Sequence, residues 1–124
     1  MSNPLMYKAF TAGAAIAAFR IVRFSAADTV VQAAAATESM FGVNSDLAVA
    51  NGERCEVMTD GIAWIEAGAA VTIGALITAD SVGRAVAGAP AAGVNNRVIG
   101  LALDAATAAG DQIRVLLSPG SVQG

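Results

Sequence analysis

The sequence predicts an all-β fold, a small barrel or sandwich built from two internal repeats. Apolar residues occur in short runs separated by Gly, Asn, Asp and Ser, which is the pattern of short strands. The segment GAAIAAFRIVRFSA, which begins at Gly13, is echoed by GAAVTIGALITADS, which begins at Gly68, at an offset of 55 (68 − 13). Residues 41–59 and 99–117 match without gaps at an offset of 58 (99 − 41).

Strands are expected where β-branched and aliphatic residues gather between turn residues. In the first copy they lie at residues 20–24, 29–33, 55–59 and 62–66. In the second copy they lie at residues 75–78, 84–87, 98–103 and 113–117. The repeats then cover about residues 13–66 and 67–120 of a single β domain at 13–124. An extended N-terminal arm at residues 1–12 precedes this domain.

The segments between the strands carry turn and loop signals. Residues 59–61 (TDG) connect two strands tightly, as in a β-hairpin. The alanine-rich stretch at residues 31–40 favours a helix by propensity, although such stretches also line packed strands and loops. Residues 88–96 contain Pro90 and two glycines, which favours a loop. The arm has no partner in the repeat and is either disordered or docked on a neighbour.

The composition indicates a surface that meets another protein. Charged residues make up only 14 % of the chain, against about 25 % in average soluble domains, and so uncharged a surface is typical of a contact region. No membrane is expected, because the uncharged stretches are shorter than the roughly 18–20 apolar residues of a spanning helix. The seven basic residues are scattered and the net charge is −3. Nucleic-acid binding is therefore not expected either, because it needs clustered Lys and Arg.

The N-terminus resembles a weak secretory signal, because Lys8 precedes the apolar residues 9–19. However, GAAI at Gly13 has its counterpart at Gly68, deep in the chain. We therefore expect this segment to belong to the fold and the chain to be made in the cytoplasm. The single cysteine excludes a disulfide within the chain.

The sequence offers no recognisable catalytic group. It contains no histidine, the commonest general base and metal ligand. Cys55 aligns with Ile113 in the repeat, which favours a buried apolar role over a reactive thiol. A solvated strand edge explains the densest carboxylates better than an acid pair does; they are Glu53, Glu56, Asp60 and Glu66. We expect no enzyme activity, no cofactor and no metal site.

Trp64 is the single tryptophan, in a chain with 5 % aromatic residues. It fits either the core or an anchor at a subunit contact, because tryptophan is favoured at interface hot spots. Tyr7 and Phe10 lie in or beside the arm. There they are expected to fill a partner's groove instead of packing within their own domain.

Two motifs are distinctive: AGAAVTIGALITAD at residues 67–80 and VIGLALDAATAAGDQIRVLLSPG at residues 98–120. With them the chain resembles the capsid decoration proteins of tailed bacteriophages, also called cement or head-stabilising proteins. The similarity spans about residues 13–120. The first copy departs from the family pattern with AAFRIVRF, where glycine is usual, so its opening hairpin is expected to differ.

The resemblance implies a compact β-barrel or tulip-like sandwich fold and a homotrimer. It also implies a structural virion protein that binds the outside of the capsid and stabilises the shell by bridging major capsid proteins. The chain would be made in the host cytoplasm and reside in the virion. Its partners would be the major capsid protein and its own copies. The candidate contact residues are Pro4, Leu5, Met6, Tyr7, Lys8, Phe10 and Trp64.

The alternative is a β-clip-like accessory or carbohydrate-binding module, such as the base of a fibre. This function needs an exposed aromatic platform, for which Trp64 and Tyr7 are the candidates. Binding to intact shells or to glycans distinguishes the two functions.

Overall fold

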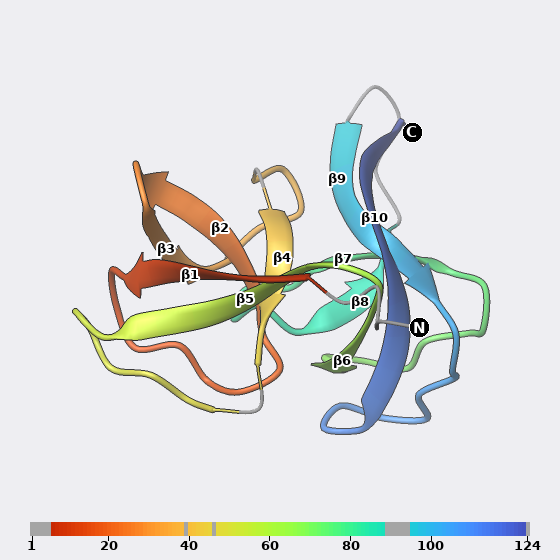
Figure 1. Ribbon diagram of the computed structural model, residues 1–124. Helices are drawn as coiled ribbons and strands as arrows, with labels where there is room; N and C mark the ends of the chain where they lie inside the picture. Colours follow the sequence, from red (N-terminus) through yellow and green to blue (C-terminus); the bar gives the residue numbers. More distant parts are fainter. Residues whose placement is uncertain (1–5, 39, 46, 89–94, 124) are drawn as a thin grey trace, which may run out of the picture.

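The computed structural model describes residues 6–38, 40–45, 47–88 and 95–123. Over these residues the protein consists of strands and turns without a helix, which confirms the all-β prediction. Ten strands form two five-stranded sheets that lie side by side (Figure 1). Within the described part of the chain, no helix is long and apolar enough to cross a membrane.

The first sheet is a closed barrel. Its strands are β1 (Met6–Ala12), β2 (Ile21–Ala26), β3 (Thr29–Gln32), β4 (Met40–Asn44) and β5 (Arg54–Asp60). They follow the order β1-β3-β2-β4-β5, and β5 pairs again with β1. The β1–β3 pair is parallel and the other pairs are antiparallel. Closure removes the free strand edges that promote aggregation.

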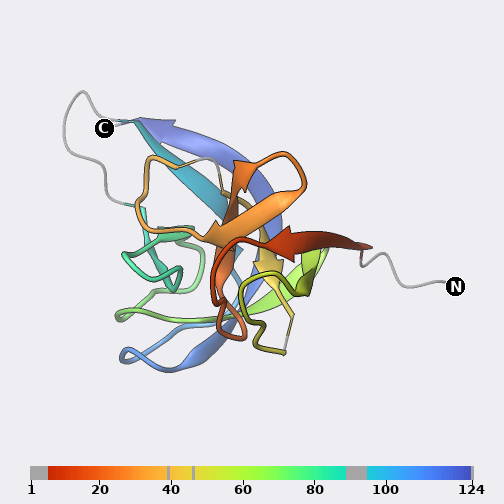
Figure 2. The same ribbon diagram turned by 90° about the vertical axis from the view of Figure 1, so that its left-hand side faces the viewer.

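The second sheet is antiparallel throughout. Its strands are β6 (Ile62–Glu66), β7 (Leu76–Ala79), β8 (Ala85–Ala87), β9 (Asn95–Ala102) and β10 (Gln112–Gln123). Their order is β6-β10-β9-β7-β8, and a parallel bridge from Ala67 to Ala85 joins the two ends. In Figure 2 the first sheet faces the viewer, and the long strands β9 and β10 run behind it.

The predicted N-terminal arm is corrected over residues 6–12, which form β1. Phe10 and Thr11 pair with Cys55 and Arg54 of β5. The barrel needs this strand for closure, because β1 lies between β3 and β5. Residues 1–5, the rest of the predicted arm, lie outside the described residues. β4 is a second strand that the sequence analysis does not predict.

The predicted hairpin at residues 59–61 is wrong. Gly61, with a φ of 91°, joins β5 of the first sheet to β6 of the second. β6 pairs with β10, so Ile62–Glu66 belongs to the second sheet. The physical reason is that β5 already has β1 and β4 as its neighbours in the barrel.

The helix considered for residues 31–40 does not form over the described part of this stretch. Residues 31 and 32 end β3, and turns follow. Ala33 is buried, and its amide donates a hydrogen bond to the carbonyl oxygen of Ile21 at 2.9 Å. Packing against β2 therefore overrides the helix propensity of alanine.

Two clusters of buried side chains form the core. The smaller one fills the barrel and comprises Ala12, Ile16, Val22, Val30, Cys55 and Val57. The larger one receives side chains from both sheets, including Ile21, Val43 and Met58 from the first and Ile65, Ile99 and Ile113 from the second. Burying one such side chain contributes about 1.5–3 kcal/mol, so hydrophobic burial holds the two sheets together.

The two sheets share a strand order and a register. Corresponding pairs are Phe10–Cys55 and Ile65–Ile113, Ile21–Val43 and Leu76–Leu101, and Ala12–Val30 and Ala67–Ala85. Their positions differ by 55 on β1 to β3 (65 − 10) and by 58 on β4 and β5 (113 − 55), the two offsets found in the sequence. These pairings support the two-copy interpretation, which remains a prediction.

The backbone is left-handed at corresponding positions. Phe19 (φ 59°) and Asp28 (φ 56°) correspond to Gly74 (φ 88°) and Gly83 (φ 79°). Phe19 lies in the AAFRIVRF stretch, where glycine was expected, and a phenylalanine at positive φ is uncommon. The turn before β2 thus keeps its left-handed residue despite the side chain.

Candidate functional site

Trp64 is exposed on the outer face of β6, with 49 % of its surface accessible. It is therefore not the core residue that the sequence allowed. Arg114 lies opposite it on β10, and the Cζ atom of Arg114 is 6.0 Å from the centroid of the Trp64 ring. A guanidinium over an indole face is a cation–π contact, so this part of the surface presents both an apolar ring and a positive charge.

Asp104 fixes the guanidinium of Arg114. Its Oδ2 and Oδ1 atoms accept hydrogen bonds from Nε and Nη2 of Arg114, both at 2.9 Å, in a bidentate ion pair. These hydrogen bonds lower the pKa of Asp104 to about 2 and raise the pKa of Arg114. The arginine therefore stays charged and oriented beside the tryptophan.

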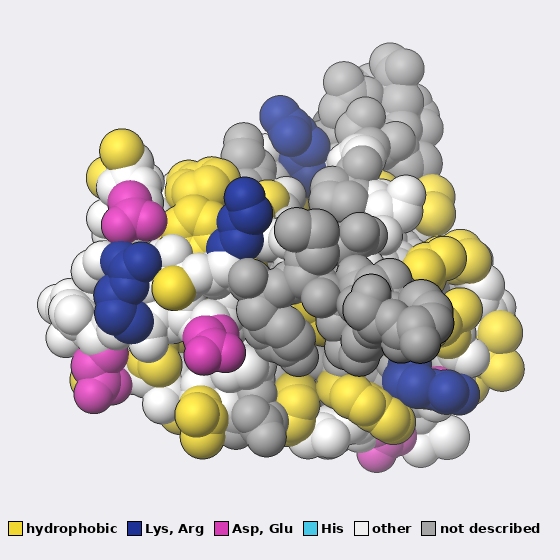
Figure 3. All heavy atoms as spheres, viewed as in Figure 1, with side chains coloured by type: hydrophobic (Ala, Val, Ile, Leu, Met, Phe, Trp, Pro, Cys, Tyr) yellow, Lys and Arg dark blue, Asp and Glu magenta, His cyan; other side chains and the backbone are white. Residues whose placement is uncertain are grey.

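An apolar row crosses the outer face of the second sheet. Ile62, Leu116, Leu101 and Leu76 lie opposite one another on the neighbouring strands β6, β10, β9 and β7. Ile62, Leu76 and Leu116 are exposed, and Leu101 is half-buried. We call these four residues the leucine row. Figure 3 shows hydrophobic side chains in yellow at the right and along the lower edge of the molecule, the half that holds the second sheet in Figure 1.

A second apolar surface lies at one end of the barrel. Phe24 and Phe41 are stacked with ring centroids 4.1 Å apart, and Phe10 meets both edge-on at 5.5 and 5.3 Å. Phe10 and Phe41 pack on the barrel core, whereas Phe24 is 44 % exposed. We call these residues the phenylalanine cluster. Phe10 therefore packs within its own domain, contrary to the prediction, because β1 is part of the barrel.

The other predicted contact residues lie at the start of the chain. Met6 and Tyr7 pair through their backbones with Asp60 and Met58 of β5, and Lys8 is exposed on β1. Pro4 and Leu5 lie outside the described residues. The residues of β1 belong to the first sheet and Trp64 to the second, so the structure does not combine them in one sheet face.

The sequence model of a protein family, described as phage cement protein, matches residues 5–117 of this chain. The chain belongs to the phage cement protein family. Membership makes it a structural protein of a phage virion, a non-enzymatic kind of protein, as the sequence resemblance indicated. A search of curated proteins found no match.

A solved structure with the same fold is "The crystal structure of head fiber gp8.5 N base in bacteriophage phi29". The two chains are 21 % identical, with a TM-score of 0.70. The similarity covers 92 % of this cement protein and 94 % of the other chain. At this identity the likeness concerns the fold.

Two of the polar side chains singled out by the sequence, Cys55 and Glu53, make hydrogen bonds within the protein. Burial raises the pKa of Cys55, whose Sγ donates to Oδ1 of Asn44 at 3.1 Å. This thiol occupies the apolar position that the repeat predicted. Glu53 accepts a hydrogen bond from the amide of Ala50. Among the described residues, no group of three or more His, Cys, Asp or Glu side chains could hold a metal ion.

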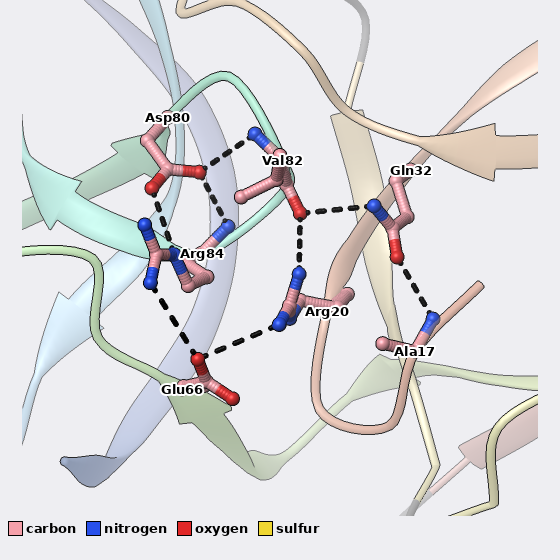
Figure 4. Close-up of polar contacts among 7 residues, drawn as sticks. All are labelled: Ala17, Arg20, Gln32, Glu66, Asp80, Val82 and Arg84. Atoms are coloured by element: carbon pink, nitrogen blue, oxygen red, sulfur yellow. Dashed lines mark hydrogen bonds and ion pairs between the residues drawn. The ribbon is translucent and has the colours of Figure 1, made fainter. Parts of the chain in front are cut away.

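A polar network joins the two sheets (Figure 4). Arg20 donates to the Val82 carbonyl oxygen at 3.0 Å and to Oε2 of Glu66 at 3.4 Å. Arg84 pairs with the same Glu66 oxygen at 3.8 Å and with Oδ2 of Asp80 at 3.1 Å. Arg20 directly precedes β2 of the first sheet, whereas Glu66 ends β6 and the other three residues connect β7 to β8 of the second sheet. The network therefore links the two sheets.

The leucine row and the phenylalanine cluster were missed by the sequence analysis. The signal for the row lies in the IRVLL motif. Val115 and Leu117 are buried, so Leu116 between them must face outward, because successive side chains of a strand alternate. An outward-facing strand position occupied by leucine instead of a polar residue is therefore the sequence signal for this exposed apolar row.

Proposed function

We propose that this cement protein binds the outside of a phage capsid and stabilises the shell by bridging neighbouring major capsid proteins. We further propose that it does so as a homotrimer, made in the host cytoplasm. The observation that carries the proposal is the exposed Trp64, oriented beside the ion-paired Arg114 on a member of the phage cement protein family. Tryptophan and arginine are among the residues enriched at binding hot spots.

Residues of the N-terminal segment remain part of the proposal. Pro4, Leu5, Met6, Tyr7 and Lys8 are proposed to extend the contact with the shell. Deleting residues 2–8 is not a clean test, because Tyr7 and Lys8 pair with Met58 and Val57 in the barrel. Lys8→Ala keeps those backbone hydrogen bonds and removes only an exposed side chain.

Co-sedimentation with mature empty shells tests the proposal. Saturable binding at one stoichiometry is expected, together with a higher temperature of shell disruption. A well-folded protein that does not sediment with shells would contradict the proposal.

The base of a fibre is the second candidate function, favoured by the fold shared with a head-fibre base. A fibre base would bind shells without raising their disruption temperature. The same shells, heated with and without bound protein, therefore separate the two functions. Retention on a glycan array through Trp64 would instead indicate a carbohydrate-binding module.

A further inference from the structure

The first sheet buries the outer side of three strands against the second sheet. Ile21, Val43 and Met58 lie opposite one another on β2, β4 and β5, and none is more than 4 % exposed. We call them the buried row. They belong to the same core cluster as Ile65 and Ile99 of the second sheet.

The buried row covers one end of the second sheet, where Ile65, Ala79 and Ile99 are buried. β4 contacts β6 and β9, the strands that carry the two isoleucines. The amide of Ile21 donates to the carbonyl oxygen of Gly83 at 2.8 Å, in the turn between β7 and β8. A Cβ atom at Gly83 would come within 2.8 Å of the Ile21 carbonyl oxygen, so the two sheets approach closely there.

Both sides of this internal contact have accessible counterparts elsewhere in the chain. At the offsets of 55 and 58, the buried row corresponds to Leu76, Leu101 and Leu116 of the leucine row. At the same offsets the covered end, Ile65, Ala79 and Ile99, corresponds to the phenylalanine cluster, Phe10, Phe24 and Phe41. The strand pairings give the same correspondence, because Ile21 pairs with Val43 as Leu76 pairs with Leu101.

We propose that the leucine row of one copy covers the phenylalanine cluster of a second copy and so repeats, between chains, the contact found within each chain. This inference deepens the assembly part of the proposed function by naming the two faces. The faces differ, so the contact is heterologous: each copy gives its leucine row to one neighbour and its phenylalanine cluster to another. Such contacts close into a ring when the rotation between copies allows it.

The contact between copies is more apolar than the internal one. At the offset of 55, Arg20 corresponds to Ala75 and Glu66 to Thr11, so the ion pair of the internal contact has no counterpart. Burial of aliphatic and aromatic side chains then supplies the affinity. Sulfate is expected to strengthen the association, and sodium chloride is not expected to weaken it.

Trp64 remains available for the shell in this arrangement. At the offset of 55, its counterpart in the first sheet is Ala9. Ala9 is exposed, although the second sheet covers the buried row beside it. A copy docked on the leucine row in the same way leaves Trp64 uncovered. Self-association and shell binding therefore use different residues.

Sedimentation equilibrium of the full chain without shells tests the inference. Leu116→Glu and Phe24→Glu each place a carboxylate in one of the two faces, and each is expected to weaken association by about tenfold or more. An equimolar mixture of the two variants is expected to regain heterodimers. The Leu116→Glu chain keeps its phenylalanine cluster, and the Phe24→Glu chain keeps its leucine row.

Leu47→Glu is the matched control, because Leu47 is 68 % exposed and belongs to neither face. Circular dichroism reports whether each variant folds. If Leu116→Glu does not fold, Ile62→Glu replaces it, and if Phe24→Glu does not fold, Phe24→Gln replaces it. Three outcomes would overturn the inference. In the first, the wild-type chain stays monomeric up to its solubility limit. In the second, the Phe24→Glu variant associates as strongly as the wild type. In the third, the equimolar mixture of Leu116→Glu and Phe24→Glu stays monomeric.

The shell assay is run separately on the same variants. A wild-type chain that associates as proposed but does not bind shells overturns the proposed function and leaves this inference standing. A chain that stays monomeric in solution but saturates shells overturns this inference and leaves the shell-binding part of the proposed function standing.

Discussion

Gly42 on β4 and Gly100 on β9 occupy the same place in the two sheets, each tight against the carbonyl oxygen of a neighbouring strand. A Cβ atom at Gly42 would come within 2.7 Å of the Met58 carbonyl oxygen, and one at Gly100 would meet the carbonyl oxygen of Leu116. Met58 and Leu116 also correspond at the offset of 58. Close strand approach is thus built into both sheets.

Alanine at either glycine is expected to destabilise the protein, since backbone must move to admit a methyl group. Gly42→Ala and Gly100→Ala are each expected to lower the free energy of unfolding by about 1–3 kcal/mol, measured by urea denaturation. Gly120→Ala is the control, because the nearest atom to its Cβ is 3.8 Å away. Equal stability of all three variants would contradict the close approach.

Trp64→Ala is expected to weaken shell binding by about tenfold or more, because a truncated hot-spot tryptophan loses buried contact area. The free energy of unfolding is expected to change little, since the side chain is half exposed. Co-sedimentation titration measures the affinity, with Leu47→Ala as the control for an exposed apolar residue. Unchanged shell affinity of Trp64→Ala would remove this residue from the contact.

The network between the sheets is expected to contribute more than a surface ion pair. The side chains of Arg20 and Glu66 are 17 % and 27 % exposed, and Arg20→Ala is expected to cost about 1–3 kcal/mol because polar partners lose their donor. Arg54→Ala breaks the pair with Asp28, whose side chains are 56 % and 62 % exposed, and is expected to cost about 0–1 kcal/mol. Urea denaturation of both variants measures the difference. A larger loss for Arg54→Ala would reverse the ranking.

Stability is expected to fall in acid partly through Asp104. Its pKa in the folded protein is about 2, below the ordinary 3.8, chiefly because of the hydrogen bond from Arg114. A carboxylate with a lowered pKa stabilises the fold fully above its unfolded pKa, and this contribution is lost as the pH falls toward the folded pKa. Between about pH 5 and about pH 2.5, Asp104→Asn is therefore expected to lose less stability than the wild type.

Urea denaturation at the two pH values measures this difference. Asp111 also has a lowered pKa, held by hydrogen bonds from Thr107. Because Asp111 is present in both proteins, their difference isolates Asp104. Parallel pH profiles would show that the Asp104–Arg114 pair does not stabilise the fold.

Local pattern was sufficient for most of the fold. Ile62–Glu66 was predicted as a strand with the observed bounds, because its apolar residues lie between turn residues. Its partner was not predictable in this way, since pairing depends on which strand edges remain free. β5 is already paired on both sides, so β6 pairs with β10 instead.

The candidate site was predicted only in part. Trp64 was identified by its rarity, and Cys55 was placed in the core by its alignment with Ile113. Phe10 was misassigned because β1 was taken for an arm. Its packing against Phe24 and Phe41 depends on barrel closure, which brings together residues distant in sequence.

The last strand of the barrel ends at Asp60, before any strand of the second sheet begins. During synthesis the five strands of the barrel therefore emerge first. In a barrel formed at that stage, Ile21, Val43 and Met58 would stay uncovered until the second half of the chain emerges. Neighbouring nascent chains on the same messenger RNA could then aggregate through these exposed apolar side chains. Protease protection of chains stalled after residue 60 would show whether the barrel forms at that stage. If it does, the second half of the chain covers these three side chains as it emerges, and the order of translation sets how long they stay exposed.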